Sequence, residues 1–188
     1  MTKQTSCLNN HFLIAMPNLK DGNFSRSVTY ICEHDENGAM GITINRPSDI
    51  ILDEVFQQLG IKTLNPEIGQ ETVYLGGPVH PDRGFLLHTP NGSWQSSLRV
   101  TDTISVTTSR DILEAIANDE SPDQLLITVG YAGWAPGQLE YELAENVWLN
   151  CPATEEIIFN TPAEKRWDAA ARLLGIDLQL LSVDTGHA

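Results

Sequence analysis

Residues that could perform acid–base or nucleophilic chemistry are sparse in this sequence of 188 residues. No serine stands in a G-x-S-x-G turn, the arrangement that presents a nucleophilic hydroxyl above a sheet. Gly76 and Gly77 precede Pro78, but no Gly-Lys-Ser or Gly-Lys-Thr run follows, as a phosphate-binding loop requires. We therefore predict no catalytic residues, and we expect a tight turn or bulge at Gly76-Gly77-Pro78.

Side chains that could ligate a metal ion are present, but not at the required spacing. His34 is followed by Asp35 in a predicted hairpin loop, and Asp82 lies near His80. A metal site needs more converging ligands than either pair offers. The three cysteines form no C-x-x-C pair and stand at unrelated positions, Cys7, Cys32 and Cys151. We predict no metal site and no cofactor.

Six residues could instead bind an anionic ligand. Irregular backbone rich in Gly and Pro exposes N–H groups that can meet an anion. Arg46 and Arg83 adjoin such backbone and are two of only 11 Lys and Arg residues. If the loops converge, we predict a ligand site made of Asn45, Arg46, Gly76, Gly77, Arg83 and His88. The alternative is that each residue satisfies its local backbone, with Arg46 in a structural ion pair and His88 as a hydrogen-bonded structural histidine.

Tyr131 and Trp134 lie in the run GYAGWAPG, which extends from Gly130 to Gly137. Glycines and proline at this density predict a rigid, tightly turned loop. The two aromatic side chains could then form a platform for a ligand or a peptide, so Tyr131 and Trp134 are a second candidate binding surface. The alternative is that Trp134 plugs the end of a barrel-like sheet.

The elements that must position these groups are short strands and amphipathic helices. Strand patterns cover residues 12–16, 27–33, 39–45, 72–75, 84–88, 104–107, 125–130 and 147–151. Helix patterns cover residues 52–59, 110–117 and 138–145, and a fourth begins at the capping box Thr161-Pro162-Ala163-Glu164 and faces Trp167 inward. Adjacent strands early and alternation later predict an α+β fold with a partly antiparallel sheet. A chain of this length buries roughly 70% of its unfolded surface, so we expect one domain over residues 1–188.

The charge balance restricts the partners. Asp and Glu number 25 against 11 Lys and Arg, and residues 111–164 hold no Lys or Arg. Direct binding to nucleic acid needs clustered Lys and Arg, so we expect no direct nucleic-acid binding and no attraction to an anionic membrane. The acidic segment is either a solvated surface or a docking face for a basic partner. An odd cysteine count, no run of about 20 apolar residues and no leader pattern favour the cytoplasm.

Four blocks of the sequence resemble the bacterial YqgE/AlgH family. The first holds LIAMP at 13–17, GAMG at 38–41 and NRP at 45–47, and the second holds VYLGGPV at 73–79 and RGFLLH at 83–88. The third holds GYAGW at 130–134 and PGQLE at 136–140, and the fourth holds LGI at 174–176 and GHA at 186–188. The resemblance implies a single-domain cytoplasmic protein with a barrel-like, branching mixed β-sheet flanked by helices. It also brings a transcriptional-regulator label and no agreed catalytic residues.

The absence of a catalytic signature sets the functional expectation. We expect a non-enzymatic binding or regulatory protein that acts through a protein partner or a small ligand. One alternative is an enzyme with an unfamiliar site near the Gly- and Pro-rich turns. Another is a transcriptional regulator, as the family label suggests, that does not bind DNA directly. The oligomeric state is not determined by the sequence.

Overall fold

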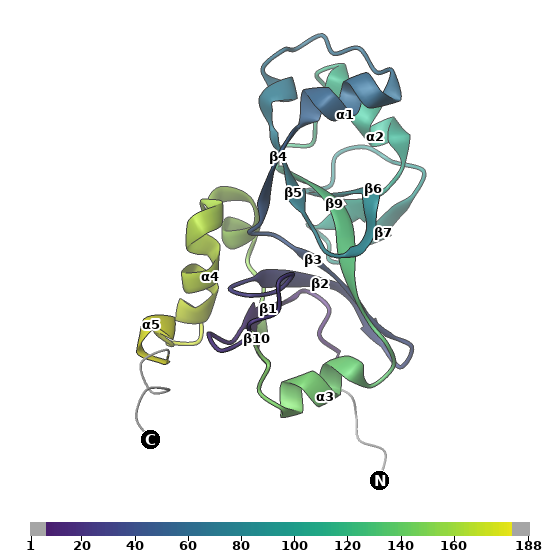
Figure 1. The fold of residues 1–188 in the computed structure, drawn as a ribbon. Helices are drawn as coiled ribbons and strands as arrows, with labels where there is room; N and C mark the ends of the chain where they lie inside the picture. Colours follow the sequence, from purple (N-terminus) through teal and green to yellow (C-terminus); the bar gives the residue numbers. More distant parts are fainter. Residues whose placement is uncertain (1–6, 182–188) are drawn as a thin grey trace.

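The computed structural model describes residues 7–181, which form an α+β fold around one curled, branched sheet (Figure 1). Its ten described strands follow the order β10-β1-β2-β3-β9-β6-β8-β7, with β4 and β5 on a branch beside β9. Neighbouring strands are antiparallel except β5 and β9, which are parallel. The predicted fold class is confirmed. The GHA block at 186–188 and both ends of the predicted 1–188 domain lie outside the described residues.

The elements follow the sequence patterns closely, with additions. The strands are β1 (His11–Ala15), β2 (Val28–Asp35), β3 (Gly38–Thr43), β4 (Pro47–Ile51), β5 (Thr72–Leu75), β6 (Val79–His88), β7 (Ser97–Arg99), β8 (Ser105–Thr107), β9 (Leu125–Trp134) and β10 (Trp148–Pro152). The helices are α1 (Leu52–Leu59), η1 (Ile68–Gln70), α2 (Arg110–Ala117), α3 (Gln138–Ala144), the π-helical turn η2 (Glu156–Asn160), α4 (Ala163–Arg172) and α5 (Leu178–Leu181). No helix among the described residues is long and apolar enough to cross a membrane.

The branch point is a close crossing of two backbone segments. β5 and β6 flank β9 on opposite sides, since Thr128 pairs with Tyr74 and with Phe85. The chain therefore crosses β9 between β5 and β6, and it does so at Gly77 and Gly130. A Cβ on Gly77 would lie 2.1 Å from the carbonyl carbon of Tyr131, and one on Gly130 would lie 2.2 Å from the Gly77 oxygen. The predicted turn is thus a crossing over a central strand, and glycine is required there because backbone meets backbone.

Three hydrophobic clusters hold the fold together. The largest lies between the sheet and α4 and includes Trp167, the second lies under α1 and α2, and the third packs around Trp134 beside α3. Trp167 is 5% exposed, and its indole N–H donates to the Ala15 carbonyl over 2.9 Å. The expected inward placement of Trp167 on the fourth helix is confirmed.

Two local predictions are wrong. Thr161 does not form a capping box: Pro162 is the N-cap residue of α4, and the Thr161 hydroxyl donates to the Glu156 carbonyl at the end of η2. The π-helical turn before α4 was not visible in the pattern, and it uses the hydroxyl that the capping box needs. The loop predicted over residues 130–137 is also wrong for its first half, because β9 continues as a strand through Gly130 to Trp134.

Candidate functional site

A large groove lies on the concave face of the sheet, between the β2–β3 hairpin and strands β6, β8 and β7. Its volume is about 1020 Å³. Its floor is apolar, and charged and polar side chains stand around its rim. The floor residues are Met40, Phe85, Leu98, Val106 and Tyr131, and the rim includes Glu33, Asp35, His80, Arg83 and Gln95.

Strand alternation explains how residues far apart in the sequence reach the groove. Successive side chains of a strand point to opposite faces, so residues two apart share one face. Arg83 and Phe85 of β6 both line the groove, as do Glu33 and Asp35 of β2. The curl of the sheet then turns these faces toward one another.

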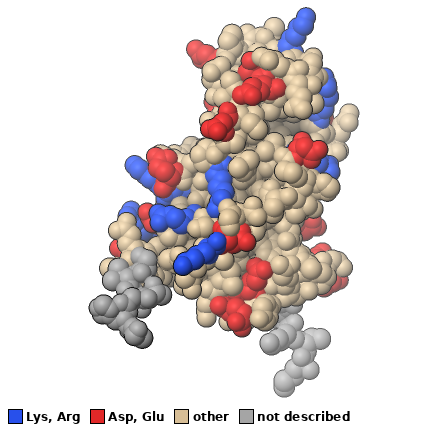
Figure 2. Space-filling view, viewed as in Figure 1, with Lys and Arg blue, Asp and Glu red and all other residues tan. Residues whose placement is uncertain are grey.

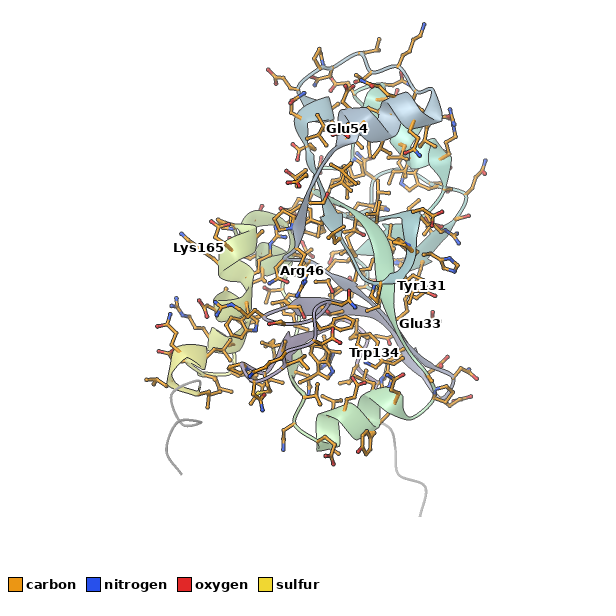
Figure 3. The ribbon with its side chains drawn as sticks, in the orientation of Figure 1. Glu33, Arg46, Glu54, Tyr131, Trp134 and Lys165 are labelled. Atoms are coloured by element: carbon orange, nitrogen blue, oxygen red, sulfur yellow. The ribbon has the colours of Figure 1, made fainter. Side chains whose placement is uncertain are left out.

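Tyr131 reaches the groove through an interruption of that alternation. Ile127 and Val129 of β9 face the second cluster, so strict alternation would place Tyr131 there as well. Gly130 has a φ of +74°, which breaks the alternation. Tyr131 consequently packs against Phe85, with ring centroids 5.3 Å apart, and lines the groove (Figure 3). Its use as a platform remains a prediction.

Trp134 closes one end of the groove from within the third cluster. Its side chain is buried, and its indole N–H donates to Glu142 Oε2 over 2.9 Å. The indole N–H of Trp148 donates to the same oxygen over 2.8 Å. One carboxylate thus anchors two indoles. This geometry supports the plug that was the alternative for Trp134, although part of the residue still lines the groove.

The rim of the groove carries charges of both signs. Arg83 is exposed and donates from Nη2 to Thr108 Oγ1 over 3.2 Å. In the described part of the chain, Arg83 and Glu33 form no ion pair. Glu33 and Asp35 stand on the hairpin side, and Arg83 stands on β6. The groove can therefore bind a cationic group beside the hairpin and an anionic group beside Arg83.

His80 adds a strained backbone to the same rim. Its φ is +46°, a left-handed conformation that non-glycine residues rarely adopt. Its imidazole centroid lies 6.0 Å from that of Tyr131. Such strain is found disproportionately where a structure serves a function.

Asn45 and Arg46 serve the fold, away from the groove. Asn45 accepts from the Val28 N–H and donates to the Arg26 carbonyl, each over 2.9 Å. Arg46 donates to the carbonyls of Gly22 and Ser25 over 2.9 and 2.7 Å. Burial lowers the pKa of the Arg46 guanidinium, and the nearby Asp21 carboxylate opposes that shift. Figure 3 shows Arg46 on the side toward α4 and Tyr131 beside β9.

The predicted convergence of six residues into one ligand site is therefore wrong. Gly76 and Gly77 are packed at the strand crossing, and His88 is 2% exposed. Of Asn45, Arg46, Gly76, Gly77, Arg83 and His88, only Arg83 lines the groove. The others contact nearby backbone or side chains, as their alternative stated. Arg46 differs in one respect: it donates to backbone carbonyls and forms none of the ion pairs found among residues 7–181.

His88 nevertheless connects to the groove through hydrogen bonds. Its Nδ1 donates to the Thr89 carbonyl over 2.9 Å, which leaves Nε2 beside Thr107 Oγ1 at 2.8 Å. Thr107 Oγ1 in turn lies 2.7 Å from Ser97 Oγ, which lines the groove. Burial lowers the pKa of the His88 imidazole, against the opposing effect of the Thr89 hydrogen bond.

Among the other candidate ligands and nucleophiles, His34 is held by hydrogen bonds, and Cys32 and Cys151 are kept protonated. His34 Nδ1 accepts from the Leu8 N–H over 3.1 Å, and its Nε2 donates to Glu140 Oε1 over 2.9 Å. Burial raises the pKa of the Cys32 and Cys151 thiols, which keeps them in the neutral form. Among residues 7–181, no group of three or more His, Cys, Asp and Glu side chains could hold a metal ion.

Sequence reasoning missed most of the groove. Met40, Leu98 and Val106 look like ordinary strand residues, and their shared surface arises only from the curl of the sheet. The exposed Glu33 was detectable, because a charge interrupts the apolar run of residues 28–32. That signal marks a residue on an accessible face, but it does not say what the face binds.

A family model described as AlgH-like matches residues 12–179. The chain belongs to the AlgH-like family. A UPF0301 protein from Nitrosococcus oceani is 55% identical over 186 residues, which cover 98% of this chain and 100% of that relative. A UPF0301 protein from Laribacter hongkongensis is 52% identical over 184 residues, which cover 98% of this chain and 99% of that relative. The resemblance to the YqgE/AlgH family is confirmed.

Two solved structures share the fold. The solution structure of the AlgH protein from Pseudomonas aeruginosa is 49% identical and covers 100% of both chains with a TM-score of 0.80. A crystal structure from Corynebacterium diphtheriae is 22% identical and covers 93% of this chain and 91% of that chain with a TM-score of 0.72. At that identity, the second match supports the fold alone.

Proposed function

We propose that this AlgH-like protein is a non-enzymatic, cytoplasmic binding protein with a regulatory role, and that the groove holds its protein partner or small ligand. The observation that carries the proposal is an open groove of about 1020 Å³ with an apolar floor. Its rim is acidic on the hairpin side and basic at Arg83. An apolar floor supplies binding free energy, and unpaired rim charges supply orientation and specificity. The three free cysteines are compatible with a reducing compartment.

The distribution of charged residues argues against a regulatory role through direct DNA binding. Acidic side chains are spread over the face seen in Figure 2, whereas Lys and Arg gather mainly beside α4. Helix α3 carries Glu140 and Glu142 and no basic residue. Phosphate contacts need a continuous basic surface, and α4 alternates its bases with Glu164 and Asp168.

The test uses two exposed rim substitutions and one matched control. Glu33→Lys and Arg83→Glu reverse charges at the groove, and Lys165→Glu reverses a charge on α4, far from it (Figure 3). Each protein is used to capture cytosolic proteins and small molecules, which mass spectrometry quantifies. We expect species captured by wild type and Lys165→Glu to be lost with the groove variants. Equal capture by all four proteins would refute the groove as the binding surface.

A second candidate function, an enzyme, rests on the hydrogen-bond chain from Ser97 through Thr107 to His88. Two hydroxyl groups joined to a neutral imidazole could pass a proton away from Ser97 at the groove. A screen with esterase, phosphatase and nuclease reporters tests this function. Turnover that Ser97→Ala and His88→Gln both abolish would establish the enzyme and displace the binding-only proposal.

A further inference from the structure

A second cavity lies between α1, α2 and the sheet face opposite the groove. Its volume is about 540 Å³, within the range of about 300–1,000 Å³ that small-molecule sites occupy. Gly84 and Leu86 of β6 contribute to it, whereas Phe85, between them, lines the groove. We call this cavity the interhelical pocket. It shares only Arg83 and Thr108 with the groove.

Aliphatic side chains form the floor and much of the wall of the interhelical pocket. Val73 and Leu86 form part of its floor and are almost fully buried, and Leu113 of α2 closes one side. Ile50 and Leu59 stand at the cavity and are each 37% exposed. An apolar cavity with exposed aliphatic side chains matches a ligand with a hydrocarbon body.

The glycine at position 84 gives independent support for a ligand in this pocket. Its φ lies outside the left-handed region, and a Cβ there would meet nothing closer than 3.8 Å, the distance to Leu86 Cδ1. Neither backbone conformation nor close approach therefore requires glycine at this position, which sits inside a strand that glycine weakens. The consequence of glycine here is open space in the interhelical pocket.

The polar groups of the pocket favour a single negative charge. Arg110 is paired with Glu114 at 2.7 Å, and Glu54 accepts from the Ile51 N–H at 3.4 Å. Within residues 7–181, Arg83 makes one side-chain hydrogen bond, to Thr108, and its guanidinium lies 5.8 Å from the centroid of the Phe85 ring. Its other N–H donors can meet a carboxylate, whose geometry a guanidinium matches. Asp82 and Glu54 also line the pocket, and their charges disfavour a dianion such as phosphate.

We propose that the interhelical pocket binds a small amphipathic monocarboxylic acid. The hydrocarbon body lies against Leu86 and Leu113, and the carboxylate meets Arg83 and Thr108. The pocket and the groove share Arg83 and Thr108, but Gly84, Leu86 and Leu113 line the pocket alone, so substitutions at these positions test the pocket separately from the groove.

The experiment titrates the full chain with decanoate, decanol and decylamine below their aggregation limits. Calorimetry gives the Kd, and the methyl resonances of Leu113 locate the ligand. We expect decanoate to bind saturably and more tightly than decanol or decylamine. Gly84→Val, which fills the pocket, should abolish binding, and Arg83→Gln should raise the Kd by about tenfold or more.

Controls separate a lost site from a lost fold. Lys165→Gln removes a charge outside the pocket and should leave the Kd unchanged. Gly84→Ala adds a single methyl group with ordinary contacts, so it should fold and weaken binding by an intermediate amount. Absence of saturable decanoate binding, equal binding of decylamine, or wild-type affinity in folded Gly84→Val would overturn the proposal. Loss of decanoate binding in Glu33→Lys would place the ligand in the groove and would also overturn it.

Discussion

Replacing Trp167 with alanine removes the side chain that joins α4 to β1. Phe or Trp to Ala changes in a core cost about 3–5 kcal/mol. The buried Ala15 carbonyl also loses its 2.9 Å donor, and Arg26 loses the ring that its guanidinium covers at 4.3 Å. An orphaned buried acceptor costs about 1–3 kcal/mol, so we place Trp167→Ala at the upper end, about 4–5 kcal/mol.

Urea denaturation followed by circular dichroism measures this cost. With a slope of about 2 kcal/mol per molar urea, the midpoint should fall by about 2 M. Trp167→Phe keeps a large ring and loses the N–H, so it should cost about 1–2 kcal/mol. A Trp167→Ala midpoint near that of wild type would refute the packing described for α4. Equal losses in both variants would show that the hydrogen bond, not the ring, joins α4 to the sheet.

Three further substitutions test other parts of the structure. Gly77→Ala should cost about 3 kcal/mol or more in unfolding free energy, because its Cβ meets backbone, whereas Gly137→Ala, with a φ of +77° in open space, should cost only about 1–2 kcal/mol; equal costs would contradict the crossing. Arg46→Ala should lower the free energy of unfolding by about 1–3 kcal/mol without changing groove binding, since Arg46 binds the carbonyls of a loop. Altered binding at unchanged stability would show that Arg46 belongs to the binding site. Burial lowers the pKa of His88, so the unfolded chain takes up this proton first, and the stability that neutral His88 contributes should be lost as pH falls through about 6.5. The pH dependence of unfolding, compared between wild type and His88→Gln, checks this: identical slopes between about pH 8 and pH 5.5 would contradict it.

The sequence was sufficient to predict those elements whose structure depends on residues close together in the chain. Apolar periodicity located α1 and α2, and Trp167 faces the core as its helical spacing predicts. The predicted hairpin is the β2–β3 hairpin, and its turn ends at Gly38, which has a φ of +127°. These features depend on residues a few positions apart, and the chain needs no distant contact to specify them.

The sequence was insufficient where surfaces are assembled from distant strands. Arg46 and Arg83 both adjoin Gly- and Pro-rich backbone, yet only Arg83 lines the groove. The difference arises because the loop of residues 18–27 folds back and presents its carbonyls to Arg46. Two glycines flagged as ligand-binding, Gly76 and Gly77, instead allow a chain crossing whose partner, Gly130, lies more than fifty residues away in the sequence.

If the groove holds the partner or ligand of this protein, site-specific photo-cross-linking from the groove should capture it. A photoreactive side chain replaces Gln95, which is exposed and lines the groove, or Tyr141, which is 66% exposed on α3 and does not. Both proteins are irradiated in living bacterial cells, and adducts are identified by mass spectrometry. We expect a defined adduct at position 95 that Glu33→Lys suppresses, and none at position 141. The same adducts at both positions, or an adduct at position 141 alone, would contradict this expectation.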